Sequence, residues 1–299
     1  MKNGSVLGGN LACFGAYALF GFNIICCRNI AVDANITPMA LFCLRAFGAT
    51  LLFWLLSLFV APGERIARGD FPKVALASFL GLFLTQTTFL VGITMATSID
   101  CAIIGTLGPV FTMIFAFFFV GEPITGKKVG GVAVSLAGVL FLIFNSVHAG
   151  GASATTPLGI VLLLMNSLTF SMYLGIFRPL ISRYSVVTFM KWAFLFSLLM
   201  SLPLSAKGLV TTDYAAIPVN VRWEIGYLIV FATVIAYYLI PYGQKYLRPT
   251  LVSMYNYLSP VIATVVSIWT GMDVITWQKV VAATSIVGGV ILVSKSRAA

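Results

Sequence analysis

The sequence predicts an all-α integral membrane protein whose ten transmembrane helices form two inverted five-helix repeats around a central cavity. Three observations lead to this prediction: the composition, ten apolar runs, and a motif that returns later in the chain. Of the 299 residues, 60% are hydrophobic and only 9% are charged, which leaves too little polar surface for a soluble globular domain. Lipid is therefore the expected solvent for most of the chain.

Each predicted span is an apolar run of about 20 residues, the length that crosses the hydrocarbon core of a bilayer. The spans cover residues 6–27, 38–60, 71–95, 99–121, 127–145, 157–177, 186–206, 223–244, 250–271 and 276–294. The first is not a cleavable signal peptide, because its apolar stretch is long, contains Asn10 and Asn23, and precedes nine similar runs. The loops are short, so one polytopic domain is expected to fill the chain.

A short motif occurs twice, at residues 105–110 and 256–261, and each copy leads into an apolar run that ends near an acidic residue. The acidic residues are Glu122 and Asp273, and the second copy follows the first by 151 positions (260 − 109, 273 − 122). This offset is about half of the 299 residues. A repeat of this size predicts a duplicated membrane fold.

The two predicted repeats cover residues 1–146 and 157–299. Because each contains five spans, an odd number, the second repeat enters the membrane from the opposite side, and the repeats are expected to be inverted. Inverted repeats give two nearly equivalent packings, whose exchange turns an outward-open cavity into an inward-open one. This arrangement favours a transporter, although duplicated membrane folds also serve channels and enzymes.

The basic residues gather on one side of the predicted topology. With a cytoplasmic N-terminus, 12 of the 18 Lys and Arg residues lie in cytoplasmic segments, four lie opposite, and Arg45 and Lys191 lie inside spans. The positive-inside rule therefore places both termini in the cytoplasm. The same loops explain the net charge of +10. No nucleic-acid partner is expected, since the basic residues are scattered singly rather than clustered in a stripe.

Two prolines are predicted to shape the cavity. Pro109 and Pro260 each lie about midway along a span, where the ring releases the carbonyl four residues back, that of Gly105 or Asn256. A released carbonyl at the bilayer midplane needs a partner, water or a substrate. We therefore expect the fourth and ninth spans to be kinked and to line the cavity. The alternative is a packing kink satisfied by neighbouring Ser or Thr side chains.

Polar side chains inside the spans are the candidate substrate ligands, because they can hydrogen-bond a zwitterion in a cavity with aromatic walls. Gln86 and Tyr237 occupy equivalent positions of the two repeats (237 − 86 = 151). The predicted substrate-binding residues are Tyr17, Gln86, Tyr173, Tyr237, Tyr238, Asn256 and Tyr257. A wider polar set comprises Asn10, Asn23, Asn166 and Thr169. Each of these side chains can instead hydrogen-bond between helices.

No carboxylate and no histidine falls deep inside a predicted span. The eight acids lie in loops or at span ends, and the single histidine, His148, lies in a loop. A proton-coupled exporter needs a group that titrates inside the membrane, so the sequence predicts a facilitator that moves its substrate down a gradient. Asp100 is a possible exception, but its place near a helix start suits a cap. We expect no metal and no cofactor.

Two charges and five cysteines remain inside the spans. Arg45 and Lys191 either meet a substrate carboxylate or snorkel to the nearer interface, and the sequence leaves both roles open. The cysteines are odd in number and membrane-embedded, so free thiols are expected rather than disulfides.

The chain resembles the EamA domains of the drug/metabolite transporter superfamily. The resemblance lies in the two five-span halves, in the Gly-rich run after each motif, and in the sequences 121–125 (Gly-Glu-Pro-Ile-Thr) and 273–276 (Asp-Val-Ile-Thr). It covers nearly the whole chain. The second copy departs from the pattern, because Asp273 is not followed by proline.

Within this superfamily the chain is similar to bacterial amino acid exporters of the YddG type. The resemblance implies export of aromatic and other neutral amino acids across the inner membrane by a protein that we expect to be a monomer. It also implies a central cavity lined by the first, third, fourth, sixth, eighth and ninth helices. These helices carry the polar residues named above.

Two other functions are alternatives for a duplicated membrane protein. Another small metabolite or a drug is the main alternative substrate, but a nucleotide sugar needs several buried Lys or Arg residues for its phosphates. An intramembrane enzyme needs paired aspartates, a zinc-binding helix motif or a Ser/His pair, which a single loop histidine cannot supply. We therefore expect no enzyme.

Overall fold

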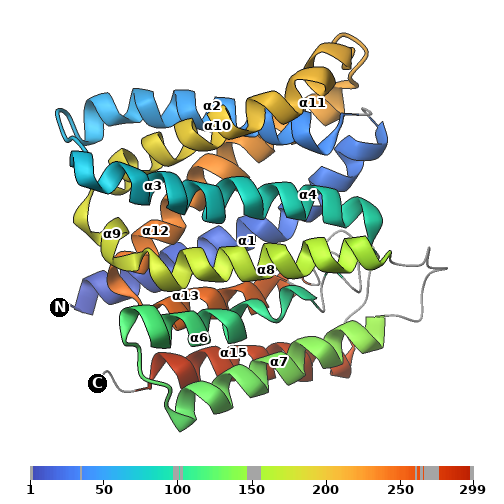
Figure 1. The fold of residues 1–299 in the computed structure, drawn as a ribbon. Helices are drawn as coiled ribbons and strands as arrows, with labels where there is room; N and C mark the ends of the chain where they lie inside the picture. Colours follow the sequence, from blue (N-terminus) through green and yellow to red (C-terminus); the bar gives the residue numbers. More distant parts are fainter. Residues whose placement is uncertain are drawn as a thin grey trace.

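The computed structural model describes residues 3–33, 36–96, 101, 104–146, 156–259, 261–262, 265 and 276–296, and every element in them is helical (Figure 1). Both ends of the chain lie at the same end of the bundle. The elements are α1 (Asn3–Asp33), α2 (Pro38–Val60), η1 (Arg68–Asp70), α3 (Phe71–Ser78), η2 (Phe79–Leu84), α4 (Thr85–Met95), α6 (Gly108–Val120), α7 (Gly126–Ser146), α8 (Pro157–Ile176), α9 (Arg178–Arg183), α10 (Val186–Thr211), α11 (Val219–Ile229), η4 (Val230–Ile235), α12 (Ala236–Tyr246), α13 (Pro249–Met254), η5 (Tyr255–Tyr257) and α15 (Trp277–Ser294).

Seven helical segments in the described residues are long and apolar enough to cross a membrane. They are Val6–Asn23, Pro38–Val60, Arg68–Met95, Pro157–Ile176, Val186–Thr211, Val219–Tyr246 and Trp277–Ser294. The bounds of α2 match the predicted span 38–60. The predicted span 99–121 differs, because its regular helix α6 begins only at Gly108. The total of ten spans stays a prediction.

Side-chain caps fix where several of these helices begin. Thr37, Thr156 and Ser185 precede α2, α8 and α10, and each accepts a hydrogen bond from a backbone N–H of the first turn. Pro38 and Pro157 follow two of these caps, at positions where a helix needs no N–H donor. The sequence therefore encodes sharp starts for these spans.

Two long helices are interrupted by π-helical turns at equivalent positions. The turns are η2 (Phe79–Leu84) and η4 (Val230–Ile235), and their first residues are 151 apart (230 − 79). The Thr85 hydroxyl donates to the Leu80 carbonyl within η2, and the Thr233 hydroxyl donates to the Leu228 carbonyl just before η4, each at 2.6 Å. π-helical turns are frequent at functional sites.

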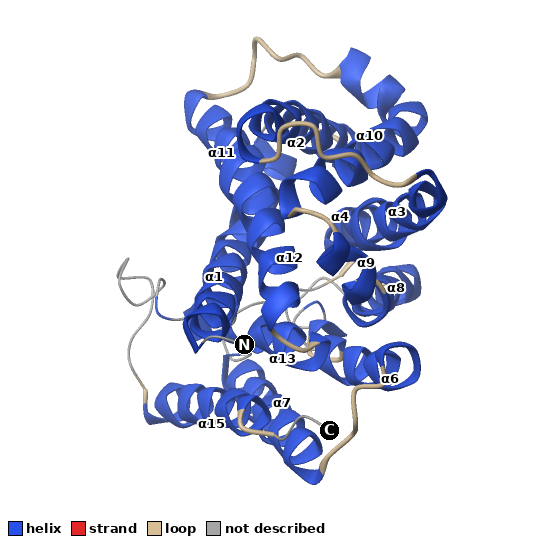
Figure 2. Ribbon diagram, turned by 90° about the vertical axis from the view of Figure 1, so that its left-hand side faces the viewer, coloured by secondary structure: helices blue, strands red, loops and turns tan. Residues whose placement is uncertain are grey.

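Equivalent helices pack against each other at both sides of the molecule (Figures 1 and 2). α2 runs antiparallel to α10, since Phe53 stacks on Phe194 at 5.5 Å whereas Thr37 lies beside Gly208. α7 and α15 also run antiparallel, since Gly131 lies against Val293 whereas Gly138 lies against Ser285, and the Ser135 hydroxyl donates to the Ile286 carbonyl at 3.1 Å. Between these two pairs lie α1, α4, α8 and α12.

The central helices cross at glycines in equivalent positions. A Cβ on Gly92 of α4 would lie 3.1 Å from the Leu163 side chain of α8, and one on Gly243 of α12 would lie 2.3 Å from the Cys13 sulfur of α1. These residues correspond closely along the chain (243 − 92 = 151, 163 − 13 = 150). The α1–α12 and α4–α8 crossings are therefore built alike.

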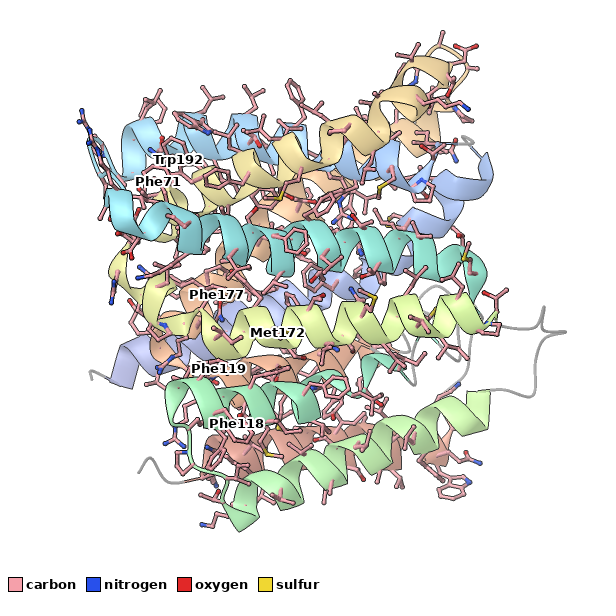
Figure 3. All side chains as sticks on the ribbon, viewed as in Figure 1. Phe71, Phe118, Phe119, Met172, Phe177 and Trp192 are labelled. Atoms are coloured by element: carbon pink, nitrogen blue, oxygen red, sulfur yellow. The ribbon has the colours of Figure 1, made fainter. Side chains whose placement is uncertain are left out.

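Many large apolar side chains lie on the outside of the bundle, Phe118 and Phe119 among them (Figure 3). Phe118 and Phe119 of α6 are 73% and 59% exposed, and Phe59 of α2 is 82% exposed. Such a surface suits lipid rather than water. Cys13, Cys26, Cys27 and Cys43 are free thiols, as expected from the sequence.

Candidate functional site: a central cavity with polar and aromatic walls

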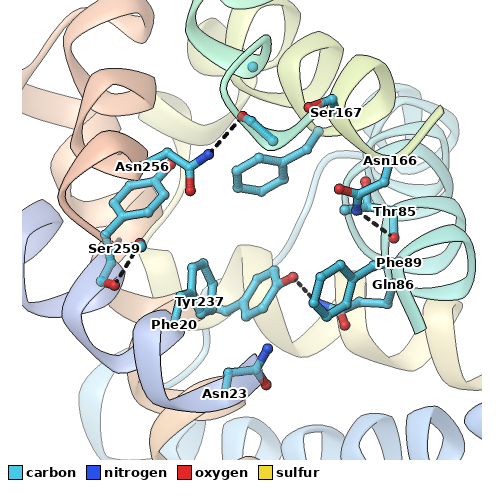
Figure 4. Close-up of a pocket in the computed structure, with 14 residues that line it drawn as sticks. Phe20, Asn23, Thr85, Gln86, Phe89, Asn166, Ser167, Tyr237, Asn256 and Ser259 are labelled. Carbon is cyan, nitrogen blue, oxygen red and sulfur yellow. Dashed lines mark hydrogen bonds between the residues drawn. The ribbon is translucent and has the colours of Figure 1, made fainter. Parts of the chain in front are cut away.

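A cavity of about 150 Å³ lies among the central helices (Figure 4). Its walls come from α1, α4, the start of α6, α8, α12 and the chain just after α13. The lining residues are Tyr17, Phe20, Asn23, Thr85, Gln86, Phe89, Gly105, Gly108, Asn166, Ser167, Phe170, Tyr237, Asn256 and Ser259. The described lining therefore includes amides, hydroxyls and aromatic rings but no Asp, Glu, His, Lys or Arg.

Aromatic rings form much of the cavity wall. Phe20 contacts Tyr17 and Tyr237 edge to face, with ring centroids 5.7 and 5.8 Å apart. Phe170 stacks on Tyr173 at 6.0 Å. These rings hold their positions by packing, so they offer a preformed apolar surface to a ligand.

The helix that precedes α6 is broken where it reaches the cavity. Residues 106–107 form a turn, and side chains from other helices bind the carbonyls around it. The Gly105 carbonyl accepts from the Asn256 amide at 3.2 Å, and the Thr106 carbonyl accepts from the Tyr257 hydroxyl at 2.8 Å. The Gly108 carbonyl accepts from the Ser171 hydroxyl at 2.9 Å. Irregular backbone at membrane depth is thus stabilised by protein partners.

The prediction for Pro109 needs correction in one respect. The Gly105 carbonyl is released, as expected, and Asn256 supplies its partner. However, Pro109 lies in the first turn of α6 and not in the middle of a kinked helix, because the chain breaks at residues 106–107. Proline fits a first turn, where its missing N–H costs no hydrogen bond. Pro260 lies outside the described residues.

Three hydrogen bonds in and beside the cavity join residues 151 positions apart. Gln86 donates to the Tyr237 hydroxyl at 2.5 Å, and the other two are the Asn256–Gly105 and Tyr257–Thr106 bonds described above. A residue can touch its own counterpart only close to the line that relates the two copies. The cavity therefore lies where the two halves of the chain meet.

The structure brings together four of the seven predicted substrate ligands. Tyr17, Gln86, Tyr237 and Asn256 line the cavity. The other three do not line it. Tyr173 is buried behind Phe170 and against Gly81, Tyr238 stacks on Tyr242 at 6.3 Å, and Tyr257 hydrogen-bonds the broken helix.

Sequence reasoning did not select several lining residues. Asn23 and Asn166 belonged only to the wider polar set, whereas Phe20, Phe89, Phe170, Ser167 and Ser259 were missed as ligands. The repeat carried part of the missing signal, because Phe20 and Phe170 are 150 apart and Gly108 and Ser259 are 151 apart. Residues that line the cavity thus tend to occupy equivalent positions of the two repeats.

Arg45 and Lys191, the two charged residues inside the predicted spans, have different surroundings in the structure. Arg45 is only 1% exposed and does not snorkel. Its Nε donates to the Thr233 hydroxyl at 2.9 Å, and its Nη1 lies 3.5 Å from the Gln86 oxygen. Lys191 is partly exposed and lies 5.2 Å from the centre of the Trp54 ring, in a cation–π contact outside the cavity.

Other charged residues lie in or beside the loops that follow α2 and α6, outside the cavity. Lys128 lies 2.9 Å from the Glu122 carboxylate, and both side chains are buried. Glu64 accepts the Ser185 backbone N–H at 2.9 Å. Burial would raise the pKa of Glu64, but hydrogen bonds from Ser185 and Thr188 and the charge of Lys245 lower the pKa below its usual value. This carboxylate therefore stays ionised at neutral pH.

Comparisons with known proteins agree with this architecture. The model of the EamA-like transporter family matches residues 7–144 and 157–295. A transporter of uncharacterised function from Bacillus subtilis, YetK, is 24% identical over 75% of this chain and 68% of its own length. A probable terminal-alkyne amino-acid exporter from Streptantibioticus cattleyicolor is 27% identical over 68% of this chain and 66% of its own length. A crystal structure with 18% identity covers 99% of both chains with a TM-score of 0.78, so the overall fold is a known one.

Proposed function

Because this chain belongs to the EamA-like transporter family, we propose that it exports amino acids by alternating access, with the central cavity as the substrate site. The family makes the chain a multi-pass membrane transporter rather than an enzyme. The observation that carries the proposal is the position of the cavity. It lies where equivalent residues of the two halves meet, so a rearrangement of one half against the other changes its access.

Ten spans in two inverted repeats, residues 1–146 and 157–299, are part of this proposal. The antiparallel packing of α7 on α15 and of α2 on α10 supports inversion, because each pair joins equivalent segments. The π-helical turns at equivalent positions support duplication. Exchange of the two packings then exposes the cavity to each side in turn.

The proposed setting is a bacterial inner membrane with both termini in the cytoplasm and the protein as a monomer. The positive-inside bias supports this orientation. Both termini lie at the end of the bundle that holds α9, whose first and last residues are Arg178 and Arg183, which agrees with it.

Neutral amino acids fit the cavity in size and chemistry. A volume of about 150 Å³ suits a small metabolite, since drug-sized ligands occupy pockets of roughly 300–1,000 Å³. The aromatic walls suit an apolar side chain, and the amides and hydroxyls suit the charged groups of the backbone. Tyr17, Gln86, Tyr237 and Asn256 are the proposed ligands, Tyr173 and Tyr257 support the cavity wall from outside, and Tyr238 is no longer a candidate. The name of the Streptantibioticus relative and the likeness to YddG-type exporters support the same substrate class.

The proposal includes transport without proton coupling, because the described lining carries no group that titrates near neutral pH. The test is uptake into proteoliposomes from a panel of amino acids, nucleosides and cationic drugs, with and without an imposed proton gradient. We expect amino acid uptake in both conditions. Strict dependence on the gradient would contradict the facilitator, and uptake of only the other compounds would contradict the substrate class.

A further inference from the structure

The Arg45 guanidinium is a buried cation beside the cavity. No carboxylate of the described residues lies within 4 Å of it, and its Nη2 has no hydrogen-bond partner. A buried charge without a paired countercharge is costly, so such a group favours an anion nearby. Arg45 does not itself line the cavity, but its contact Gln86 does.

Arg45 fixes the direction of the hydrogen bonds that lead into the cavity. A guanidinium can only donate, so Gln86 must turn its amide oxygen toward Nη1, 3.5 Å away. The Gln86 nitrogen then donates to the Tyr237 oxygen at 2.5 Å. Tyr237 consequently keeps its own hydroxyl proton for a further acceptor. The chain from Arg45 through Gln86 to Tyr237 therefore ends in a donor, with a cation behind it to strengthen each step.

The opposite wall of the cavity has the reverse polarity (Figure 4). The Asn166 amide nitrogen donates to the Thr85 carbonyl at 2.8 Å, and the Asn256 amide nitrogen donates to the Gly105 carbonyl at 3.2 Å. A carbonyl can only accept, so both asparagines must use their nitrogens there. Their oxygens are left as acceptors for a ligand.

We infer that the cavity binds its substrate in one orientation, with a carboxylate at Tyr237 on the Arg45 side and an ammonium group at the oxygens of Asn166 and Asn256. The inference rests on the proposed function and names the groups that select an α-amino acid. Each wall stabilises one charge of the zwitterion. Arg45 acts as a positioning residue, because it reaches the carboxylate through Gln86 and Tyr237.

The test compares three ligands that differ in one charged group. L-Phenylalanine has both charges, L-phenylalaninamide lacks the carboxylate, and 3-phenylpropionate lacks the ammonium group. Their affinities for the purified, lipid-embedded protein are measured by competition against labelled L-phenylalanine. We expect the wild type to favour L-phenylalanine over both analogues.

Each wall has its own variants. In Arg45→Met and Tyr237→Phe, the preference for L-phenylalanine over its amide should fall at least tenfold, whereas the preference over 3-phenylpropionate should persist. In Asn256→Ala the preference over 3-phenylpropionate should fall at least tenfold, whereas the preference over the amide should persist. Arg45→Lys, which keeps the charge, should retain part of the preference for the acid.

Lys191→Met is the matched control, because it removes a cation that lies inside a predicted span but outside the cavity. It should leave both preferences unchanged. If Arg45→Met does not yield folded protein, Tyr237→Phe decides, since it removes one hydroxyl and keeps the ring. If Tyr237→Phe prefers L-phenylalanine over its amide as strongly as the wild type does, the inference is overturned, but the proposed amino acid transport is not. Failure of the wild type to bind or transport any amino acid overturns the proposed function itself.

Discussion

The α7–α15 crossing and the central cavity both join equivalent segments of the chain, but they do so with different chemistry. At the crossing the residues are small. A Cβ on Gly289 would clash with the Gly131 carbonyl oxygen, and one on Gly138 would lie only 2.9 Å from the Ser285 Cβ of α15. At the cavity the contact is a polar pair, Gln86 and Tyr237, beside open space.

This difference assigns different tasks to the two regions. Small residues let helix backbones approach closely, and the resulting contacts are lost if either helix shifts. Polar side chains around a cavity can exchange partners with a ligand at little net cost. We therefore interpret α7 and α15 as a fixed support and the cavity helices as the part that responds to substrate.

The largest expected effect is the loss of the buried ion pair at the start of α7. Lys128→Met leaves the Glu122 carboxylate buried without its countercharge and should destabilise the protein by about 3–5 kcal/mol. Lys127→Met, which changes an exposed neighbour, is the control. Thermal unfolding in detergent measures both, and equal melting temperatures would show that α7 is not anchored by this pair.

Overpacking of the α7–α15 crossing should have the next largest effect. In Gly289→Ala the new methyl group meets the Ser135 hydroxyl and the Gly131 backbone, which cannot move aside, so we expect a loss of about 1–3 kcal/mol. Gly288→Ala is the matched control, because a Cβ there meets no atom within 4 Å. A stable Gly289→Ala protein with normal transport would remove the distinction between a fixed support and a responsive centre.

Changes at the cavity should affect transport more than folding. Tyr237→Ala and Asn256→Ala remove lining groups and should lower uptake at least tenfold, while the protein still elutes as a single species. Tyr238→Ala alters the neighbouring residue, which faces Tyr242 instead of the cavity, and should transport nearly normally. Wild-type uptake by both cavity variants would exclude these residues from the site.

The sequence predicted the parts of the site that depend on the repeat. The 151-residue offset assigns Gln86 and Tyr237 to equivalent positions of the two repeats, and the structure shows that the two side chains are in contact. Helix rotation was harder to predict, because successive residues of a helix point about 100° apart and an apolar span has no polar face to fix the angle. For this reason Tyr238 is a predicted ligand, although in the structure it lies outside the cavity.

Interactions between distant segments could not be predicted in the same way. The burial of Arg45 depends on Thr233 and Gln86, which lie on two other helices. Its place in the predicted span is compatible both with contact to a substrate carboxylate and with snorkelling to the interface. The break at residues 106–107 likewise depends on partners from α8 and from residues 256–257.

Counterflow tests the central claim most directly. Proteoliposomes are loaded with unlabelled L-phenylalanine and diluted into a trace of the labelled amino acid, with no proton or ion gradient. Alternating access through a shared cavity predicts that labelled substrate accumulates transiently above its external concentration. Simple equilibration without this overshoot, or accumulation only under an imposed proton gradient, would contradict the account.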